Sequence, residues 1–168
     1  RKILAILKAH DISATFFCIG RQAQKHPELL NEILASGHTV GNHSQTHKNG
    51  WKTTTVDYVN EVTDCARIFT SSLFRPPYGK ITPKQVRKLK RNYKIIMWDV
   101  LGADFDFRVD AKKIETNITK NTHSGSIIVL HDNPKFAAKM LEALPLIITN
   151  LKEKGYVFSS IDATLLHP

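Results

Sequence analysis

The stretch Ser126-Ile127-Ile128-Val129-Leu130, followed at once by His131-Asp132, decides the fold class. An apolar run of strand length without polar alternation is typical of a strand that is buried on both faces, as parallel sheets require. A second run of this kind, Ala14-Thr15-Phe16-Phe17-Cys18-Ile19-Gly20, lies near the start of the chain. The two runs together predict an α/β domain with a parallel sheet.

Helical and strand patterns alternate along the rest of the chain. We expect helices over residues 1–9, 27–35, 55–71, 110–121 and 134–152, and one more that begins at Thr82-Pro83. We expect strands over residues 14–20, 39–41, 73–74, 93–100, 126–130 and 156–158. The inner face of the helix over 55–71 is expected to carry Val56, Val59, Val62, Ala66 and Phe69. A sheet closed into a barrel and an open doubly wound sheet both fit this alternation.

Length and composition indicate a single globular domain over residues 1–168. The 168 residues are 42% hydrophobic, which excludes disorder, and they amount to about two-thirds of an eight-stranded α/β barrel. No apolar stretch approaches the roughly 18 residues of a membrane span. The chain begins with Arg1 inside an amphipathic helical pattern, so we expect it to be N-terminally incomplete.

The net charge of +9 favours anionic partners, either a nucleic acid or an acidic polysaccharide. The basic residues are spread along predicted helices, and no aromatic residues are interleaved with them in a base-stacking pattern. A solvated basic surface is therefore the preferred interpretation, and we predict no nucleic-acid partner. The oligomeric state cannot be read from the sequence.

Polar residues follow four of the predicted strands. His43 and His47 come after 39–41, Arg75 after 73–74, Asp104 after 93–100, and His131 after 126–130. The carboxyl ends of parallel strands converge on one rim, where active sites are built. The sequence therefore predicts a site at this rim.

His43 and His47 are spaced four residues apart, which on a helical turn places both rings on one side. At this spacing one divalent ion can bridge them, and imidazole suits Zn, Fe, Co or Ni. A pair of surface histidines in a polar loop is the alternative interpretation.

His131 is a candidate general acid or base, because histidine is the side chain that most often transfers protons near neutral pH. A carboxylate within hydrogen-bonding distance would orient its ring, and both Asp104 and Asp132 are candidates. Asp99, near the end of the predicted strand over 93–100, is a further candidate, and we favour Asp104. Arg75, held before two prolines, could clamp a carboxylate or form a structural salt bridge.

Taken in order, four motifs resemble those of the polysaccharide deacetylase family, also called the NodB-homology domain or carbohydrate esterase family 4. They are Ala14-Thr15-Phe16-Phe17, Gly41-Asn42-His43-Ser44-Gln45-Thr46-His47, Arg75-Pro76-Pro77-Tyr78-Gly79 and Ile128-Val129-Leu130-His131-Asp132. The resemblance covers nearly the whole chain. It implies a distorted (β/α) barrel of about seven strands, with the first strand missing from this chain.

The resemblance also implies an activity, a cofactor and a location. Family members are hydrolases that remove N- or O-acetyl groups from chitin-like glycans, peptidoglycan or xylan, so we expect an acetylated polysaccharide as substrate. They use one divalent metal ion, for which we expect zinc first and Co, Ni, Fe or Mn as alternatives. The cell envelope or the extracellular space is the location that the resemblance favours.

Roles for individual residues follow from the same resemblance. His43 and His47 would be metal ligands, and the first motif, Thr-Phe-Asp-Asp, would supply the base and a third ligand upstream of Arg1. The catalytic group would comprise Arg75, which orients the base, the Tyr78 backbone N–H, which binds the oxyanion, the general acid His131, and Asp104, which tunes it. The substrate would contact Pro77, Leu130 and Phe105, which stands where the family usually has tryptophan.

Two other functions compete with this interpretation. A relative that has lost its base would bind glycans without hydrolysing them, although retention of Arg75 argues against that loss. A basic nucleic-acid module would show binding that falls steeply with salt.

Overall fold

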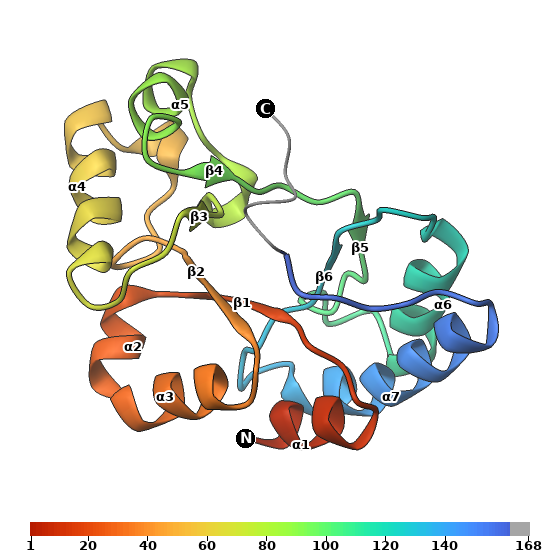
Figure 1. The fold of residues 1–168 in the computed structure, drawn as a ribbon. Coiled ribbons are helices and arrows are strands. Elements are labelled where there is room, and N and C mark those ends of the chain that lie inside the picture. Colours follow the sequence, from red (N-terminus) through yellow and green to blue (C-terminus); the bar gives the residue numbers. More distant parts are fainter. Residues whose placement is uncertain (162–168) are drawn as a thin grey trace. The chain divides into compact units, whose positions relative to one another are not determined.

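The structure is a computed structural model of the chain, and it describes residues 1–161. These residues form two compact units (Figure 1). The first unit comprises Arg1–Ile12 and Trp98–Phe158, and the second comprises Ser13–Met97 together with the stretch that begins at Ser159. Each unit has its own sheet and its own helices.

The second unit is built on a four-stranded parallel sheet with strand order β1-β2-β3-β4. Its strands are β1 (Thr15–Cys18), β2 (Thr39–Asn42), β3 (Leu73–Phe74) and β4 (Lys94–Ile95). The helices between them are α2 (Gly20–Lys25), α3 (Pro27–Ala35), α4 (Thr55–Ala66) and α5 (Pro83–Leu89), and short 3₁₀ turns cover Gly50–Lys52 and Pro77–Gly79. Asn42, at the end of β2, pairs with Cys18 on one side and Phe74 on the other. This register places the residues after β2 and β3 at the same edge of the sheet.

Helix α4 presents its inner face at positions 58, 61, 62 and 65, which follow the i, i+3, i+4, i+7 spacing of an amphipathic helix. Tyr58 and Val62 are fully buried in a cluster with Phe74 and Leu89. The predicted inner face is confirmed at Val62, which is fully buried, and at Val59, which packs against the same cluster, but it was wrong at Val56, which is 69% exposed. The prediction counted only aliphatic and aromatic residues of one stripe and therefore missed a stripe that includes a buried glutamate.

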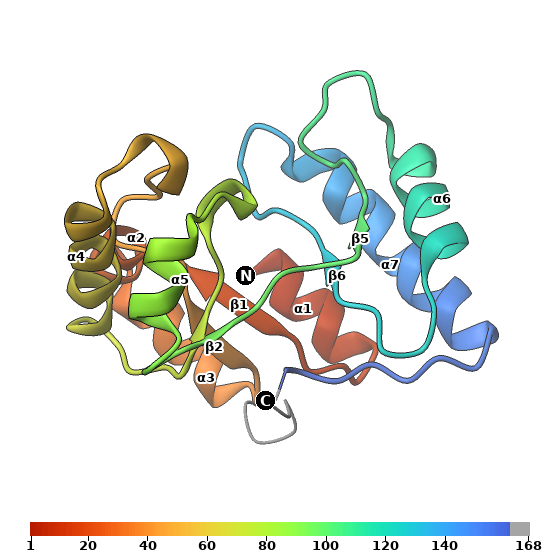
Figure 2. The same cartoon turned by 90° about the horizontal axis from the view of Figure 1, so that it is seen from above.

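The first unit contains α1 (Lys2–Ala9), β5 (Val100–Leu101), α6 (Ala111–Asn121), β6 (Ile128–Val129) and α7 (Ala137–Glu153). Strands β5 and β6 form a parallel pair. Helices α6 and α7 lie side by side in both views (Figure 2). Their facing residues form one apolar core with the sheet, made of Val100, Ala111, Ile114, Ile118, Ala143, Ile147 and Leu151.

The predicted α/β class with parallel strands is confirmed. Three predicted elements differ most from the structure. The strand predicted over 93–100 is interrupted, because the chain leaves the four-stranded sheet after β4 and joins β6 only at β5. The helix predicted over 55–71 ends at Ala66. Residues 156–158 form no strand, and the Tyr156 hydroxyl instead donates to the carbonyl of Thr122 at 3.0 Å.

Helix α2 was not predicted, because its six residues are too few to show a helical period. Within residues 1–161, no helix is both long enough and apolar enough to span a membrane. The single-domain assignment over residues 1–168 stays a prediction.

We expect Glu115 to be a main stabilising residue between α6 and α7. It is 4% exposed and accepts hydrogen bonds from Lys112 Nζ at 2.8 Å, Thr119 Oγ1 at 3.1 Å and Asn150 Nδ2 at 2.7 Å. Glu115→Ala removes these bonds, so the free energy of unfolding should fall by about 1–3 kcal/mol at pH 7, measured by urea denaturation.

The same change should alter the pH dependence of stability. The hydrogen bond from Lys112 lowers the pKa of Glu115 in the folded protein. The stabilisation is therefore complete above the ordinary carboxyl pKa and is lost as the pH falls through the lower folded value, so the difference in the free energy of unfolding between wild type and variant should narrow steadily as the pH falls below about 4. Glu142→Ala, at an exposed position of α7, is the matched control. Equal effects of the two substitutions would contradict the prediction.

Candidate active site

His43 and His47 lie in the loop that follows β2 in the second unit. Their ring centroids are 4.9 Å apart and nearly edge to face. His43 Nδ1 lies 2.6 Å from the backbone carbonyl oxygen of Arg75. A carbonyl can only accept, so Nδ1 carries a proton, and in the neutral form of the ring Nε2 presents a lone pair. This is the orientation that metal-ligating histidines use.

The backbone between the two histidines is held in an unusual conformation. Ser44 and His47 both have φ of +64°, in the left-handed region that L-residues rarely adopt. The Asn42 side chain accepts from the Ser44 N–H at 2.9 Å, and Ser44 Oγ accepts from the His47 N–H at 3.0 Å. Short polar side chains thus satisfy the backbone of this turn and fix the direction of both rings.

Glu61 of α4 binds the same turn through its carboxylate, and the sequence analysis did not identify this residue as part of the site. Its carboxylate accepts from the Thr46 backbone N–H at 2.7 Å and from Thr46 Oγ1 at 2.9 Å. Its backbone carbonyl accepts from the Gln45 N–H at 2.8 Å, and Lys48 Nζ lies 3.3 Å from the carboxylate. The residue is 8% exposed. The helical spacing of Tyr58, Glu61, Val62 and Cys65 was the available signal for its burial.

Arg75 follows β3 directly and is buried. Its guanidinium donates to the carbonyls of Ile96 at 3.3 Å and Met97 at 3.2 Å, and its Cζ lies 4.1 Å from the centroid of the Phe17 ring. Burial lowers the pKa of Arg75 to about 10, so the side chain remains charged at neutral pH. Arg75 therefore places a fixed positive charge at the end of β3.

Tyr78 lies in the turn after β3 and contacts the histidine loop. Its φ of +59° is again left-handed, and its ring centroid is 4.6 Å from that of His47. Pro77, predicted to contact substrate, is buried in this turn. The second unit thus brings together four of the predicted residues, namely His43, His47, Arg75 and Tyr78.

In the first unit, Asp104 and His131 form a close pair after β5 and β6. Asp104 is fully buried. Its Oδ2 accepts from the His131 backbone N–H at 2.6 Å, and its Oδ1 lies 2.9 Å from His131 Nδ1. The carboxylate therefore binds both the backbone and the ring of His131. Since Nδ1–H donates to Asp104, any proton that this ring transfers is carried by Nε2.

Phe105 and Leu130 flank this pair. Phe105 lies edge-on to the His131 ring, with 5.3 Å between centroids. Leu130 packs against the core of the first unit. Asp99, the alternative carboxylate, has other partners: it accepts from the Ile127 N–H at 2.6 Å and from Ser126 Oγ at 2.9 Å. Asp104, not Asp99, therefore contacts His131.

The donor chemistry of the histidine loop fits two ligands of a divalent ion. Imidazole nitrogens suit zinc and its neighbours, and the His43–Arg75 hydrogen bond fixes the required tautomer. Among residues 1–161, however, no group of three or more His, Cys, Asp or Glu side chains could hold a metal ion. Two imidazoles are therefore the donors that we assign.

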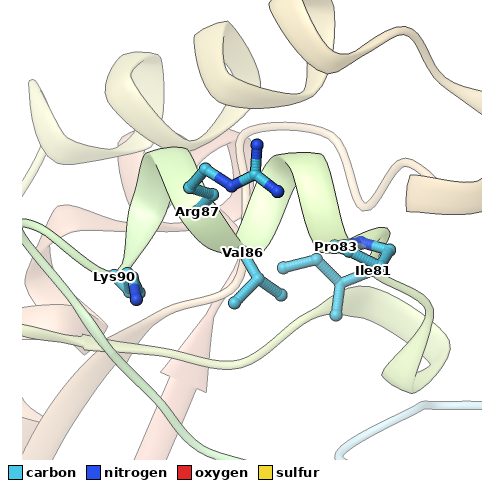
Figure 3. Close-up of a pocket in the computed structure, with 5 residues that line it drawn as sticks. All are labelled: Ile81, Pro83, Val86, Arg87 and Lys90. Carbon is cyan, nitrogen blue, oxygen red and sulfur yellow. The ribbon is translucent and has the colours of Figure 1, made fainter.

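A shallow pocket lies along α5, and its lining begins three residues after Tyr78. Figure 3 shows its lining, in which apolar Ile81, Pro83 and Val86 are joined by Arg87 and Lys90. The pocket contains no acid–base pair and none of the predicted site residues. We assign it no role in catalysis.

A family model and curated relatives match this chain. The model described as polysaccharide deacetylase matches residues 1–97. A peptidoglycan-N-acetylglucosamine deacetylase of Bacillus cereus is 34% identical over 168 residues, which cover 95% of this chain and 61% of that protein. The peptidoglycan-N-acetylmuramic acid deacetylase PdaA of Bacillus subtilis is 31% identical over 172 residues, covering 96% of this chain and 64% of that protein. The chain thus spans less than two-thirds of the length of either relative.

A solved structure shares the fold as well. It is a carbohydrate esterase family 4 pseudoenzyme from Bacillus anthracis, 30% identical, with a TM-score of 0.86 over 95% of this chain and 58% of that chain. The family model matches more than half of the 168 residues. The chain belongs to the polysaccharide deacetylase family.

Proposed function

We propose that this protein hydrolyses acetyl groups from the amino sugars of a polysaccharide such as peptidoglycan. Water adds to the acetyl carbonyl carbon, the C–N bond breaks, and acetate and a free amino sugar are released. The observation that carries the proposal is the buried Asp104 carboxylate, which holds His131 by both its backbone and its ring. This arrangement is suited to proton transfer at a fixed point.

His131 is the proposed general acid. An amide nitrogen leaves poorly unless it is protonated, and a positioned acid typically accelerates such a step by about 10²–10⁴-fold. Asp104 is the proposed positioning residue, because its hydrogen bond to Nδ1 places the transferable proton on Nε2. The same carboxylate stabilises the ring when it is charged.

His43 and His47 are the proposed metal ligands. A divalent ion held there would supply Lewis-acid chemistry, which polarises a carbonyl and makes a nearby water more acidic. Zinc is the ion that we expect first, with Co, Ni, Fe or Mn as alternatives. The two rings are held for this task by Arg75 O, Ser44 and Tyr78.

Two further residues have proposed roles at the reacting carbonyl. The backbone N–H of Tyr78 donates to the oxygen that becomes negatively charged, and one such donor contributes roughly 3 kcal/mol to transition-state stabilisation. Arg75 would orient, through its fixed charge, the carboxylate base that the family resemblance assigns to the Thr-Phe-Asp-Asp motif. Leu130 and Phe105 of the first unit and Pro77 of the second unit are each proposed to contact substrate.

The competing function is glycan binding without hydrolysis. The solved relative from Bacillus anthracis is described as a pseudoenzyme, and only two histidines of the described residues form the candidate metal site. Such a protein would bind envelope polysaccharide in a saturable way and release no acetate when Zn or Co is added. Retention of the Asp104–His131 pair favours the hydrolase, since a binding module has no use for a fixed proton donor.

The first experiment measures acetate released from N-acetylated peptidoglycan or chitooligosaccharide by the purified protein with added Zn or Co. We expect acetate release by the wild type, and we expect His47→Ala to lose both tight metal binding and activity. Bound metal is measured by elemental analysis. Undiminished turnover of His47→Ala at low metal would rule out the proposed ligand, and binding without acetate release would favour the competing function.

Asp104→Asn should separate proton transfer from metal binding. An asparagine amide can donate to Nδ1 and so favours the wrong ring tautomer, which should lower kcat by about 10²–10⁴-fold. Metal content should equal that of the wild type, in contrast to His47→Ala. A kcat within twofold of the wild type would show that Asp104 only supports the fold.

Glu61→Ala should weaken metal binding although the side chain touches neither histidine in the contacts described above. The substitution leaves Thr46 without the two hydrogen bonds that hold the turn, so we expect the dissociation constant for Zn to rise about tenfold in calorimetric titration. Glu61→Gln can accept from the Thr46 N–H and donate to its hydroxyl, and it should restore most of the affinity. Asp64→Ala, on the same helix and paired with Arg67, is the control. Equal metal affinity in all three variants would refute this role.

A further inference from the structure

Two phenylalanines and a lysine form an exposed group on the first unit. Phe107 is 69% exposed, and its ring centroid lies 4.7 Å from that of the half-buried Phe136. Lys135 Nζ lies 4.6 Å from the centroid of Phe107 and 5.9 Å from that of Phe136. We call these three residues the aromatic–lysine group. Exposed aromatic rings with a cation beside them are typical of binding surfaces rather than of solvated loops.

The aromatic–lysine group continues directly from the Asp104–His131 pair. Phe107 comes three residues after Asp104, in the loop after β5. Lys135 and Phe136 follow His131 in the loop after β6. The two loops are joined by the hydrogen bond from the His131 N–H to Asp104. Lys139 joins them again, since its ammonium donates to the carbonyls of Asp106 and Val109. His131 and the aromatic–lysine group therefore lie on the same pair of joined loops, and one ligand could contact both.

The charges around the group leave one ammonium without a carboxylate. Arg108 pairs with Asp106 at 2.7 Å, and Lys139 is occupied by two backbone carbonyls. Lys135 forms no ion pair with any residue in the described part of the chain, including Asp132 of the same loop. Within the described residues, the Lys135 ammonium instead lies over the rings of Phe107 and Phe136.

We propose that Phe107, Phe136 and Lys135 form a subsite for a sugar residue that bears a carboxylate. The C–H face of a pyranose ring is apolar and packs on an aromatic ring, and the ammonium at its edge would pair with the carboxylate. The inference rests on the proposed deacetylase function, whose substrate class it narrows.

The chemistry of the candidate glycans supports this choice. Chitin-like polymers consist of neutral N-acetylglucosamine, whereas N-acetylmuramic acid carries a lactyl ether that ends in a free carboxylate wherever no stem peptide is attached to it. Similar identity to an N-acetylglucosamine and to an N-acetylmuramic acid deacetylase, 34% and 31%, does not distinguish the two. Lys135 would distinguish the two sugars, because its positive charge is complementary to the carboxylate of N-acetylmuramic acid and N-acetylglucosamine has no such group.

The test compares two tetrasaccharides of equal length, chitotetraose and alternating N-acetylglucosamine–N-acetylmuramic acid. Their binding to the protein is measured by calorimetry and their hydrolysis by acetate release. The wild type should bind the carboxylate-bearing ligand more tightly. Lys135→Gln should weaken that binding about three- to fivefold and leave the affinity for chitotetraose unchanged. Phe107→Ala should weaken the binding of both ligands, because it removes the aromatic surface on which both would pack.

Lys113→Gln is the matched control, since it removes the same charge from an exposed position of α6 in the same unit. The preference for the carboxylate ligand should also shrink as salt is raised. Failure of the wild type to bind the carboxylate ligand more tightly than chitotetraose, or equal effects of Lys135→Gln and Lys113→Gln, would overturn the subsite. Carboxylate-dependent binding without acetate release would leave the subsite standing and refute the proposed hydrolysis. Acetate release from both tetrasaccharides without any charge preference would do the opposite.

Discussion

The buried carboxylate of Asp104 is the constraint on which the geometry of His131 and its loop in the first unit depends. A charge with no exposed surface is costly unless its oxygens find hydrogen bonds inside the protein. Both oxygens find them on His131, one at the backbone and one at the ring. The requirement therefore joins the loops after β5 and β6 and fixes the ring tautomer.

The second unit meets a similar requirement in a different way. Glu61 is nearly buried and satisfies its carboxylate with the backbone and hydroxyl of Thr46 and with Lys48. Here the carboxylate contacts the turn between two histidines and not a histidine itself. In each unit a buried acid positions imidazole rings, in one case by direct contact and in the other through the intervening backbone.

The sequence predicts the parallel α/β class and the residues at the ends of strands, because apolar runs and the polar residues that follow them are local features. His43, Arg75, Asp104 and His131 are found in this way. Glu61 is not, since its burial depends on which face α4 turns inward. The choice of Asp104 over Asp99 is settled in the structure by contacts 27 residues apart. The break between β4 and β5 likewise depends on pairing partners and not on the apolar pattern.

The left-handed backbone at Ser44, His47, Tyr78 and Ala103 limits how these loops can be moved between proteins. Each such residue costs roughly 1–2 kcal/mol and persists only where the surroundings impose it. The seven-residue motif from Gly41 to His47 is therefore not expected to keep its conformation outside this fold. Grafted alone onto another scaffold, it would relax to ordinary dihedral angles and separate its rings. A successful transplant has to carry Glu61 and the helix that presents it.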